Sequence, residues 1–135
     1  MKLNPYIHYD GDCAEAFAFY ERALGGKITM MSRYGEAPAD SRPPGADDLV
    51  MHAEFNVEGA VLYGSDAPPE WAQTIGGFSV ALQFNDVDKA GAAYDALVEG
   101  GKPVMPMAET FWAHSFGMLV DRFDVPWMLN CPKGM

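Results

Sequence analysis

The chain has few cysteines and few basic residues. Its two cysteines, Cys13 and Cys131, are not part of a CxxC pair, so neither a zinc cluster nor a redox motif is indicated. Nine Lys and Arg stand against 19 Asp and Glu, which gives a net charge of −10. Because nucleic acids and anionic membranes bind basic surfaces, we expect neither as a partner. The acidity either keeps the protein soluble or favours a neutral or cationic ligand.

The sequence also lacks a long apolar run. No segment approaches the roughly 20 apolar residues of a transmembrane helix. Met1-Lys2 leads directly into a predicted strand, without the apolar core of a signal peptide. We therefore expect a reduced, cytoplasmic protein. A chain of 135 residues is expected to form a single domain, residues 1–135, with a substantial core.

The main feature that is present is a pattern that occurs twice. Residues 6–27 read as a strand, a turn, a helix and a glycine stop, and residues 81–102 read in the same way. The doublet Gly25-Gly26 returns as Gly100-Gly101, a shift of 100 − 25 = 75 positions. Two copies are too few for a solenoid. The repeat therefore predicts one domain built from two similar halves.

Alternation of polar and apolar residues, together with turn signals, predicts the elements of each half. Helices are expected at about 13–24 and 87–99, with Asp12 and Asp86 as caps. Three loops stand out, 34–48, 66–77 and 108–115. Strands are expected at 5–9, 27–33, 49–57, 60–65, 78–84, 103–107, 116–121 and 125–131. Each half, about 1–66 and 77–135, is therefore a βαβββ module of an α+β fold.

In such a module the helix covers one face of the sheet, and the other face needs cover that the second module can supply. We expect the paired modules to form a cupped, incompletely closed mixed β-barrel with the helices outside. Strand parity then selects the residues that face the cup. They are more polar than a core should be: Asn4, Tyr6, His8, His52, Glu54, Tyr63, Ser79, Gln83, Met128 and Asn130.

His52 and Glu54 are the strongest candidates for chemistry. They share one strand face, about 6.5 to 7 Å apart along the strand, and His8 can face the same cup. His, His and Glu together suit an acid–base pair or a displaced metal site. The alternative is a hydrogen-bonded polar cluster that only lines a pocket.

Aromatic residues and one further histidine complete the candidate set. Trp112 and His114, in the loop 108–115, can reach a ligand, although an exposed loop histidine needs no function. Tyr6 and Tyr63 offer hydroxyls at the wall of the cup. Cys13 lies at a helix start, where a thiol pKa can fall, but no partner base is in view and we interpret it as structural.

At this point the chain resembles a known family. Paired βαβββ modules are similar to the vicinal oxygen chelate superfamily, which includes glyoxalase I, extradiol dioxygenases and bleomycin-resistance proteins. The resemblance covers nearly the whole chain and is specific to the PhnB-like subfamily. It is carried by Pro5-Tyr6-Ile7, Asp10-Gly11-Asp12-Cys13, Phe19-Tyr20, Met51-His52-Ala53-Glu54, Phe111-Trp112-Ala113, Asp121-Arg122-Phe123 and Pro126-Trp127-Met128. Asp124 departs from it, because the family usually has glycine in that turn.

The resemblance implies a fold and a homodimer, and it also indicates where a metal site would lie. The resemblance maps the superfamily's metal ligands onto Asn4, Tyr63, Ser79 and Met128, with Pro5 or Val80 as the alternative at the first or third position. In either case the usual His and Glu are absent. We therefore expect no cofactor, with a divalent metal at His8, His52 and Glu54 as the alternative. The family's proteins are commonly homodimers, so a homodimer is expected here.

Members of the subfamily often carry the name 3-demethylubiquinone-9 3-methyltransferase. The usual nucleotide-binding fold of such enzymes needs a parallel sheet and a glycine-rich loop between strand and helix. Here the glycines occur as doublets at helix ends. We treat the methyltransferase label as a name and not as an activity.

The sequence favours binding of a small organic molecule, with catalysis left open. The alternatives are a lyase or transferase that uses His52 and Glu54, with or without a metal, and a protein that sequesters a cationic drug. The expected ligand contacts, beside that pair, are Tyr6, His8, Tyr63, Gln83, Trp112, His114 and Met128.

Overall fold

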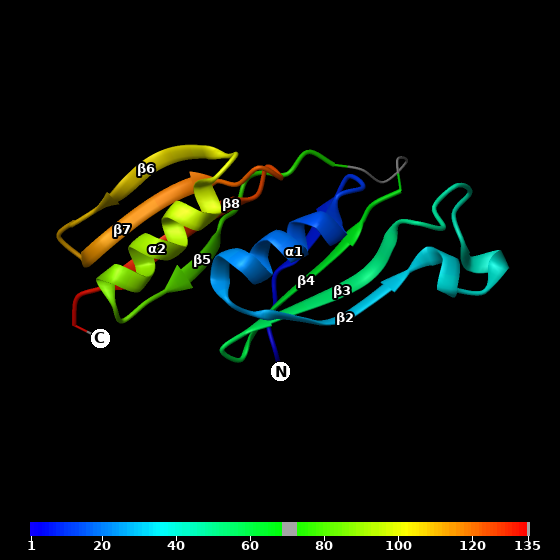
Figure 1. Cartoon of the computed structure of the whole chain (residues 1–135), viewed down its shortest axis with the longest axis horizontal. Helices are drawn as coiled ribbons and strands as arrows, with labels where there is room; N and C mark the ends of the chain where they lie inside the picture. The colour runs from blue at the N-terminus through cyan, green and yellow to red at the C-terminus, as the bar shows by residue number, and fades with distance from the viewer. Residues whose placement is uncertain (69–72, 135) are drawn as a thin grey trace. The chain divides into compact units, whose positions relative to one another are not determined.

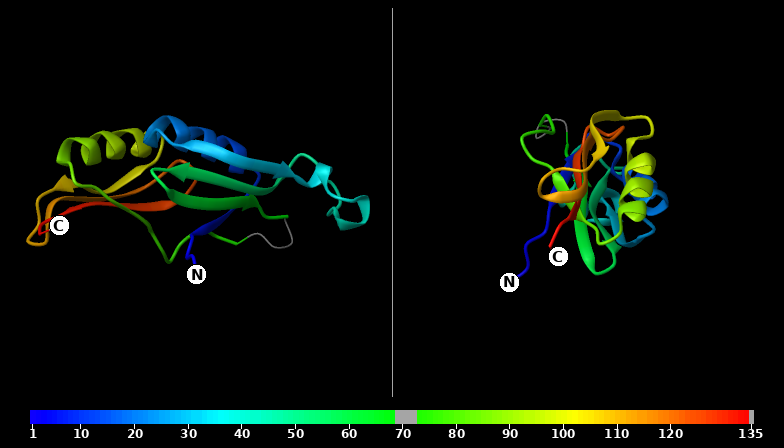
Figure 2. Two further views of the ribbon diagram at one scale, coloured as in Figure 1. Left: turned by 90° about the horizontal axis from the view of Figure 1, so that it is seen from below. Right: turned by 90° about the vertical axis from the view of Figure 1, so that its left-hand side faces the viewer.

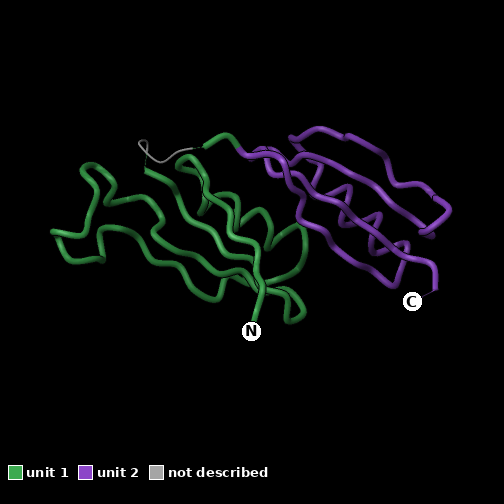
Figure 3. The backbone as a smooth tube through the Cα atoms, turned by 180° about the vertical axis from the view of Figure 1, so that it is seen from behind, with its two compact units in different colours: residues 1–74 green, residues 75–135 purple. Residues whose placement is uncertain are grey.

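A computed structural model of the chain describes residues 1–68 and 73–134. The protein is α+β and contains two βαβββ modules, as predicted (Figure 1). It divides into two compact units, residues 1–74 and 75–135 (Figure 3). The elements are β1 (Tyr6–Tyr9), α1 (Cys13–Leu24), β2 (Lys27–Arg33), β3 (Val50–Val57) and β4 (Ala60–Asp66), then β5 (Val80–Gln83), α2 (Val87–Val98), β6 (Lys102–Ala108), β7 (Ala113–Val120) and β8 (Pro126–Pro132).

Each unit contains one mixed four-stranded sheet that is not closed into a barrel. The strand order is β1-β4-β3-β2 in the first unit and β5-β8-β7-β6 in the second. In both, the first strand of the module pairs in parallel with the last, and the other pairs are antiparallel. Figure 2 shows that each helix lies against one face of its own sheet. Within the described residues, no helix has the length and hydrophobicity needed to cross a lipid bilayer.

The core of the first unit is aromatic. Phe17 of α1 lies with its ring 6.3 Å from that of Phe55 and 6.1 Å from that of Tyr9. The hydroxyls of Tyr9 and Tyr20 are hydrogen-bonded to each other at 3.0 Å, so neither is buried without a partner. All four side chains are buried. Burial of each side chain contributes about 1.5–3 kcal/mol to the stability of the fold. The packing of these aromatic rings holds α1 on the sheet.

The second unit uses smaller helix residues and one tyrosine. Ala90, Ala93 and Leu97 are buried on α2, and small residues let the helix lie close to its sheet. The hydroxyl of Tyr94 lies 3.0 and 3.1 Å from the carbonyl oxygens of Met105 and Met118, to either of which it can donate. That contact fixes α2 over the β6–β7 pair.

The glycine doublets have a steric cause that is the same in both units. Gly25 has a φ of 76°, and its N–H donates to the carbonyl of Glu21 at 3.0 Å, which ends α1. A Cβ on Gly26 would lie 2.5 Å from the carbonyl oxygen of Asn56 on β3. Gly100 repeats the left-handed conformation with a φ of 77°, and Gly101 repeats the close approach to a neighbouring strand.

The first helix is capped by a residue that the sequence analysis did not select. Asp12 makes no side-chain cap, because its backbone (φ −117°, ψ 22°) is not extended. Instead Oδ1 of the buried Asp66 accepts the N–H of Cys13, and Oδ2 accepts the N–H of Val50, both at 2.9 Å. For α2 the prediction is confirmed, since Asp86 accepts the N–H groups of Asp88 and Lys89.

The predicted loop 34–48 separates β2 from β3, and the predicted loop 66–77 lies partly outside the described residues. The segment 34–48 contains two 3₁₀ turns, Tyr34–Glu36 and Ala39–Ser41. One other loop prediction needs correction. The prediction that His114 lies in a loop is wrong, because β7 begins at Ala113 and not at residue 116. Ala113 pairs with Pro132 and Ser115 with Cys131, across an irregularity in the register. This irregularity interrupts the alternation of inward- and outward-facing residues, which is the sequence pattern that predicts a strand.

Candidate functional site

Five of the predicted site residues lie together on the sheet of the first unit, on the face away from α1. In β1, Tyr6 and His8 are exposed while Ile7 and Tyr9 are buried at 2% and 1% exposure. Tyr6 is in register with Tyr63, and Tyr63 with Glu54, so these three form a row across β1, β4 and β3. We call the following set the polar–aromatic cluster: Tyr6, His8, His52, Glu54 and Tyr63.

The ring of Tyr6 contacts the other three rings of the cluster. The centroid of Tyr6 lies 5.1 Å from that of His8, 5.5 Å from His52 and 6.1 Å from Tyr63. His52 and Tyr63 are 5.3 Å apart. The planes are tilted by 30° to 49°, so the rings form a continuous aromatic surface instead of a stack. Such a surface can contact a flat ligand through several faces at once.

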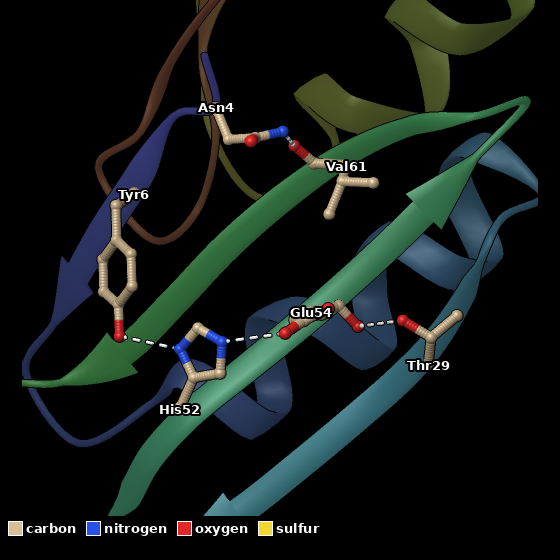
Figure 4. Close-up of polar contacts among 6 residues, drawn as sticks. All are labelled: Asn4, Tyr6, Thr29, His52, Glu54 and Val61. Atoms are coloured by element: carbon tan, nitrogen blue, oxygen red, sulfur yellow. Dashed lines mark hydrogen bonds and ion pairs between the residues drawn. The ribbon is translucent and has the colours of Figure 1, made fainter. Parts of the chain in front are cut away.

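A chain of two hydrogen bonds joins three members of the cluster (Figure 4). The hydroxyl of Tyr6 lies 3.0 Å from Nδ1 of His52, and Nε2 of His52 lies 3.0 Å from Oε2 of Glu54. The His52 and Glu54 side chains keep 28% and 34% of their surface exposed. The imidazole is therefore held from both sides, while the group as a whole remains accessible.

Residues that the sequence analysis missed support this face. The hydroxyl of the buried Ser65 lies 3.3 Å from Nδ1 of His8. Ser32 of β2 is in register with His52, and its Oγ is buried without a hydrogen-bond partner within the described residues. Thr29 donates to the main-chain carbonyl of Glu54 at 3.3 Å. Only the pairing register, which a single sequence does not show, could have found these positions.

The other predicted contacts belong to the second unit. Gln83 is exposed, and its Oε1 accepts the side-chain N–H of Asn130 at 2.9 Å. Met128 is half-buried and lies in register with Met118, which in turn pairs with Met105. Trp112 is 42% exposed, with its ring 5.3 Å from that of Phe116. His114 is exposed on β7.

Cys13 is not a reactive thiol. It is fully buried. Burial raises the pKa of its thiol, and the negative charges of Asp66 and Asp12 add to this, while Arg33 opposes it. A protonated, buried thiol is neither a nucleophile nor a metal ligand, so the fall in pKa that a helix start can cause does not occur here.

The donor atoms at the superfamily's metal positions do not suit a divalent metal. Asn4 and Tyr63 offer an amide and a phenol, and Nδ2 of Asn4 already donates to the carbonyl of Val61 at 3.1 Å. Across residues 1–68 and 73–134, no group of three or more His, Cys, Asp and Glu side chains is arranged to hold a metal ion. A metal on His52 would have to displace either Tyr6 or Glu54, since both ring nitrogens are engaged.

Comparisons with known proteins agree with this fold. The sequence profile of the glyoxalase/bleomycin resistance protein/dioxygenase superfamily matches residues 2–129. Protein YjdN of Escherichia coli K12 is 36% identical over 142 residues, which cover 98% of this chain and 97% of YjdN.

Solved structures give the same result. Protein PA1353 from Pseudomonas aeruginosa has a TM-score of 0.90 at 39% identity, over 98% of each chain. The PhnB protein from Bacillus cereus has a TM-score of 0.79 at 23% identity, over 97% of this chain and 99% of that one, a likeness of fold. The match over residues 2–129 and the identity with YjdN together show that the chain belongs to the glyoxalase/bleomycin resistance protein/dioxygenase superfamily.

Proposed function

We propose that the first unit binds a small organic molecule against the polar–aromatic cluster. The observation that carries this proposal is the contact of four rings and one carboxylate on an accessible sheet face. Residues with hydrogen-bonding groups that are placed on paired strands can hold a ligand in a fixed orientation, which loops do less well. We further propose that the chain belongs to the PhnB-like subfamily, on the motifs described above and on the fold likeness to PhnB.

The charges of the cluster favour a neutral or cationic ligand. Glu54 is its only acidic member, and none of its five residues is Lys or Arg. The chain as a whole carries a net charge of −10, so an anion would approach against the field of the protein. A cation would gain from both Glu54 and the ring faces.

Residues of the second unit remain proposed ligand contacts. Trp112 offers a partly exposed indole, and His114 and Gln83 offer exposed polar groups. Met128 offers a flexible thioether, a group that adapts to apolar ligands. Mutation of each in a binding assay tests its contribution separately from that of the cluster.

A second candidate function is acid–base catalysis by His52 and Glu54 in a lyase or transferase. The specific observation in its favour is the position of His52 between a phenol and a carboxylate. Sequestration of a cationic drug is the third candidate. Binding through charge alone weakens steeply as salt rises, so a salt-independent affinity would speak against it.

The proposal can be tested with three probes that share one ring and differ in charge: phenol, benzylamine and benzoate. We expect phenol and benzylamine to shift the backbone amide NMR signals of β1, β3 and β4, and benzoate to shift them much less. His52→Asn and Glu54→Gln should weaken both interactions and leave the melting temperature nearly unchanged. Glu99→Gln is a matched control, because this exposed carboxylate pairs with Arg122 outside the cluster.

Two results would contradict the proposal. One is a set of shifts that lies away from the cluster for all three probes. The other is early unfolding of both variants, which would show that His52 and Glu54 only stabilise the β3 strand.

A further inference from the structure

Resting on the proposed binding function, we propose that Tyr6 is the proton-transfer group of this site, activated through His52 by Glu54. The substrate class that fits is a neutral compound with a carbonyl or ester group. Hydrogen bonds connect the carboxylate of Glu54 through the imidazole of His52 to the phenol of Tyr6. Each link is a hydrogen bond of 3.0 Å.

The direction of the chain follows from the chemistry of its two ends. An ionised carboxylate can only accept hydrogen bonds, so Nε2 of His52 must carry the proton that faces Glu54. In the neutral imidazole this leaves Nδ1 with a lone pair. The hydroxyl of Tyr6 must then donate to Nδ1, since that nitrogen has no proton to give.

This arrangement is that of an activated nucleophile or base. A hydroxyl is bonded to an imidazole, and the imidazole is oriented by a third group, the pattern by which weak nucleophiles are activated. When the phenol oxygen takes a proton from a substrate, or attacks a carbonyl, its own proton passes to Nδ1. The resulting imidazolium keeps its Nε2–H on Glu54, whose negative charge stabilises it.

Tyr6 is also the most exposed of the three hydrogen-bonded residues. It is 42% exposed, more than the side chains of His52 and Glu54. Tyr63 provides a comparison in the same molecule, because it lies beside Tyr6 in the same row of the sheet. Among the hydrogen bonds of the described residues, none joins the Tyr63 hydroxyl to His52 or Glu54, so only one of the two phenols is connected to a base.

The substrate class follows from the charges. An oxygen that loses its proton beside Glu54 would repel an anionic substrate, and the cluster supplies no Lys or Arg to offset this. A neutral carbonyl carbon can approach such an oxygen and can be held over the neighbouring rings. The site therefore fits neutral carbonyl and ester compounds better than carboxylates or phosphates.

The probe for this proposal is p-nitrophenyl acetate, used with the complete chain. The phenol oxygen of Tyr6 attacks the ester carbonyl, a C–O bond forms, p-nitrophenolate leaves, and the phenol proton passes to His52. The product is O-acetyl-Tyr6, which peptide mass spectrometry can locate, with O-acetyl-Tyr63 as the internal reference. We expect Tyr6 to be acetylated at least about tenfold faster than Tyr63.

Substitutions distinguish activation from simple exposure. Glu54→Gln and His52→Asn should lower the rate at Tyr6 at least about tenfold and leave the rate at Tyr63 within about twofold. Equal rates at the two tyrosines, or a rate at Tyr6 that neither variant changes, would overturn the proposal. If phenol binds at the cluster but Tyr6 is not activated, only this inference fails. If Tyr6 is activated but no probe binds there, only the binding function fails.

A second measurement uses the unmodified protein, without a reactive probe and without a substitution that could prevent folding. Nitrogen NMR of the imidazole rings reports which ring nitrogen carries the proton, and the chain has three histidines to assign. We expect neutral His52 to be protonated at Nε2, with Nδ1 free to accept from Tyr6. A proton on Nδ1 would reverse the chain and overturn the proposal.

Discussion

The indole of Trp127 donates its Nε1–H to Oδ2 of Asp121 at 2.9 Å, and both side chains are almost completely buried. Oδ1 of the same carboxylate accepts the N–H groups of Phe123 and Val125, at 2.8 and 3.0 Å. One carboxylate thus closes the β7–β8 turn and fixes the largest side chain of the second core. The turn and the core of this unit are therefore a single structural feature.

We predict that Asp121→Ala destabilises the protein by about 3 kcal/mol or more, because three buried donors lose their acceptor. Asp121→Asn keeps one acceptor oxygen and should cost less. Urea unfolding followed by tryptophan fluorescence measures both. The matched control is Asp124→Asn in the same turn. Asp124 is exposed with a φ of 70°, a conformation that Asn also tolerates, so its effect should stay within about 0.5 kcal/mol. Equal effects at the two positions would contradict this account.

The second prediction concerns the thiols. Because burial raises the pKa of Cys13, and both cysteines are buried, the folded protein should react with Ellman's reagent much more slowly than free cysteine at pH 8. Both thiols should react at once after unfolding in guanidinium chloride. Rapid labelling of Cys13 in the folded state would show that the start of α1 opens in solution.

A third prediction is a pH dependence that originates at Asp12. Burial raises the pKa of this carboxyl above its ordinary value of 3.8; a hydrogen bond to its own backbone opposes this, and the charges of Asp66, Glu15 and Asp10 add to the rise. The folded state therefore holds the proton more tightly than the unfolded state. The carboxyl favours folding below pH 3.8, and this contribution is lost as the pH rises through the folded-state pKa.

Asp12→Asn should therefore be more stable than the parent at neutral pH, and the difference should shrink as the pH falls toward 3.8. Thermal unfolding across this pH range measures it. The control must be a carboxylate without a structural hydrogen bond, which excludes Glu36 because it accepts the N–H of Arg33 at 2.6 Å. Asp88→Asn, at the start of the other helix, serves instead. A gain that grows on acidification would have the wrong sign for this mechanism.

The fourth prediction is that protein purified without chelator holds well under one metal ion per chain. The reason is the donor set at Asn4, Tyr63, Ser79 and Met128, which lacks imidazole and carboxylate. Elemental analysis provides the measurement. A stoichiometric metal that is lost in His52→Asn would instead favour a displaced site with His8 and Glu54.

The fifth prediction is that the protein is a homodimer at micromolar concentration. Several large apolar side chains are exposed, among them Phe111 at 90%, Val104 at 56% and Met105 at 45%. A second copy of the chain would bury such surface. Sedimentation velocity measures the mass directly, and a species of 14.7 kDa would contradict the prediction.

The sequence was most informative where local signals coincide. The bounds of α1 and β2 were predicted to the residue, because a glycine doublet separates them and little else in the local sequence competes. Strand parity also placed Tyr6, His52 and Glu54 on the face away from α1, since the period of a strand is two and burial enforces it. Their mutual distances required the register between β1, β4 and β3.

The features that the sequence does not predict share one physical cause. Asp66, not Asp12, caps α1, and the two groups that it joins are 53 and 16 positions away in the sequence. The prediction of a loop at His114 is wrong because β7 is irregular near its start. Ser65 and Ser32 belong to the site only because they lie beside His8 and His52 on adjacent strands. Such long-range pairings leave no local pattern in one sequence.

The position of Asp66 also sets an order for the assembly of the first unit during synthesis. The N–H of Cys13 at the start of α1 leaves the ribosome before its acceptor, which lies at the last residue of β4. A nascent chain that ends before Asp66 can form α1 only with the N–H of Cys13 still bonded to water. The hydrogen bonds of the first unit are therefore complete only when the end of β4 has left the ribosome. A ribosome that stalls before that point carries a module in which Asp66 cannot yet bind the start of α1.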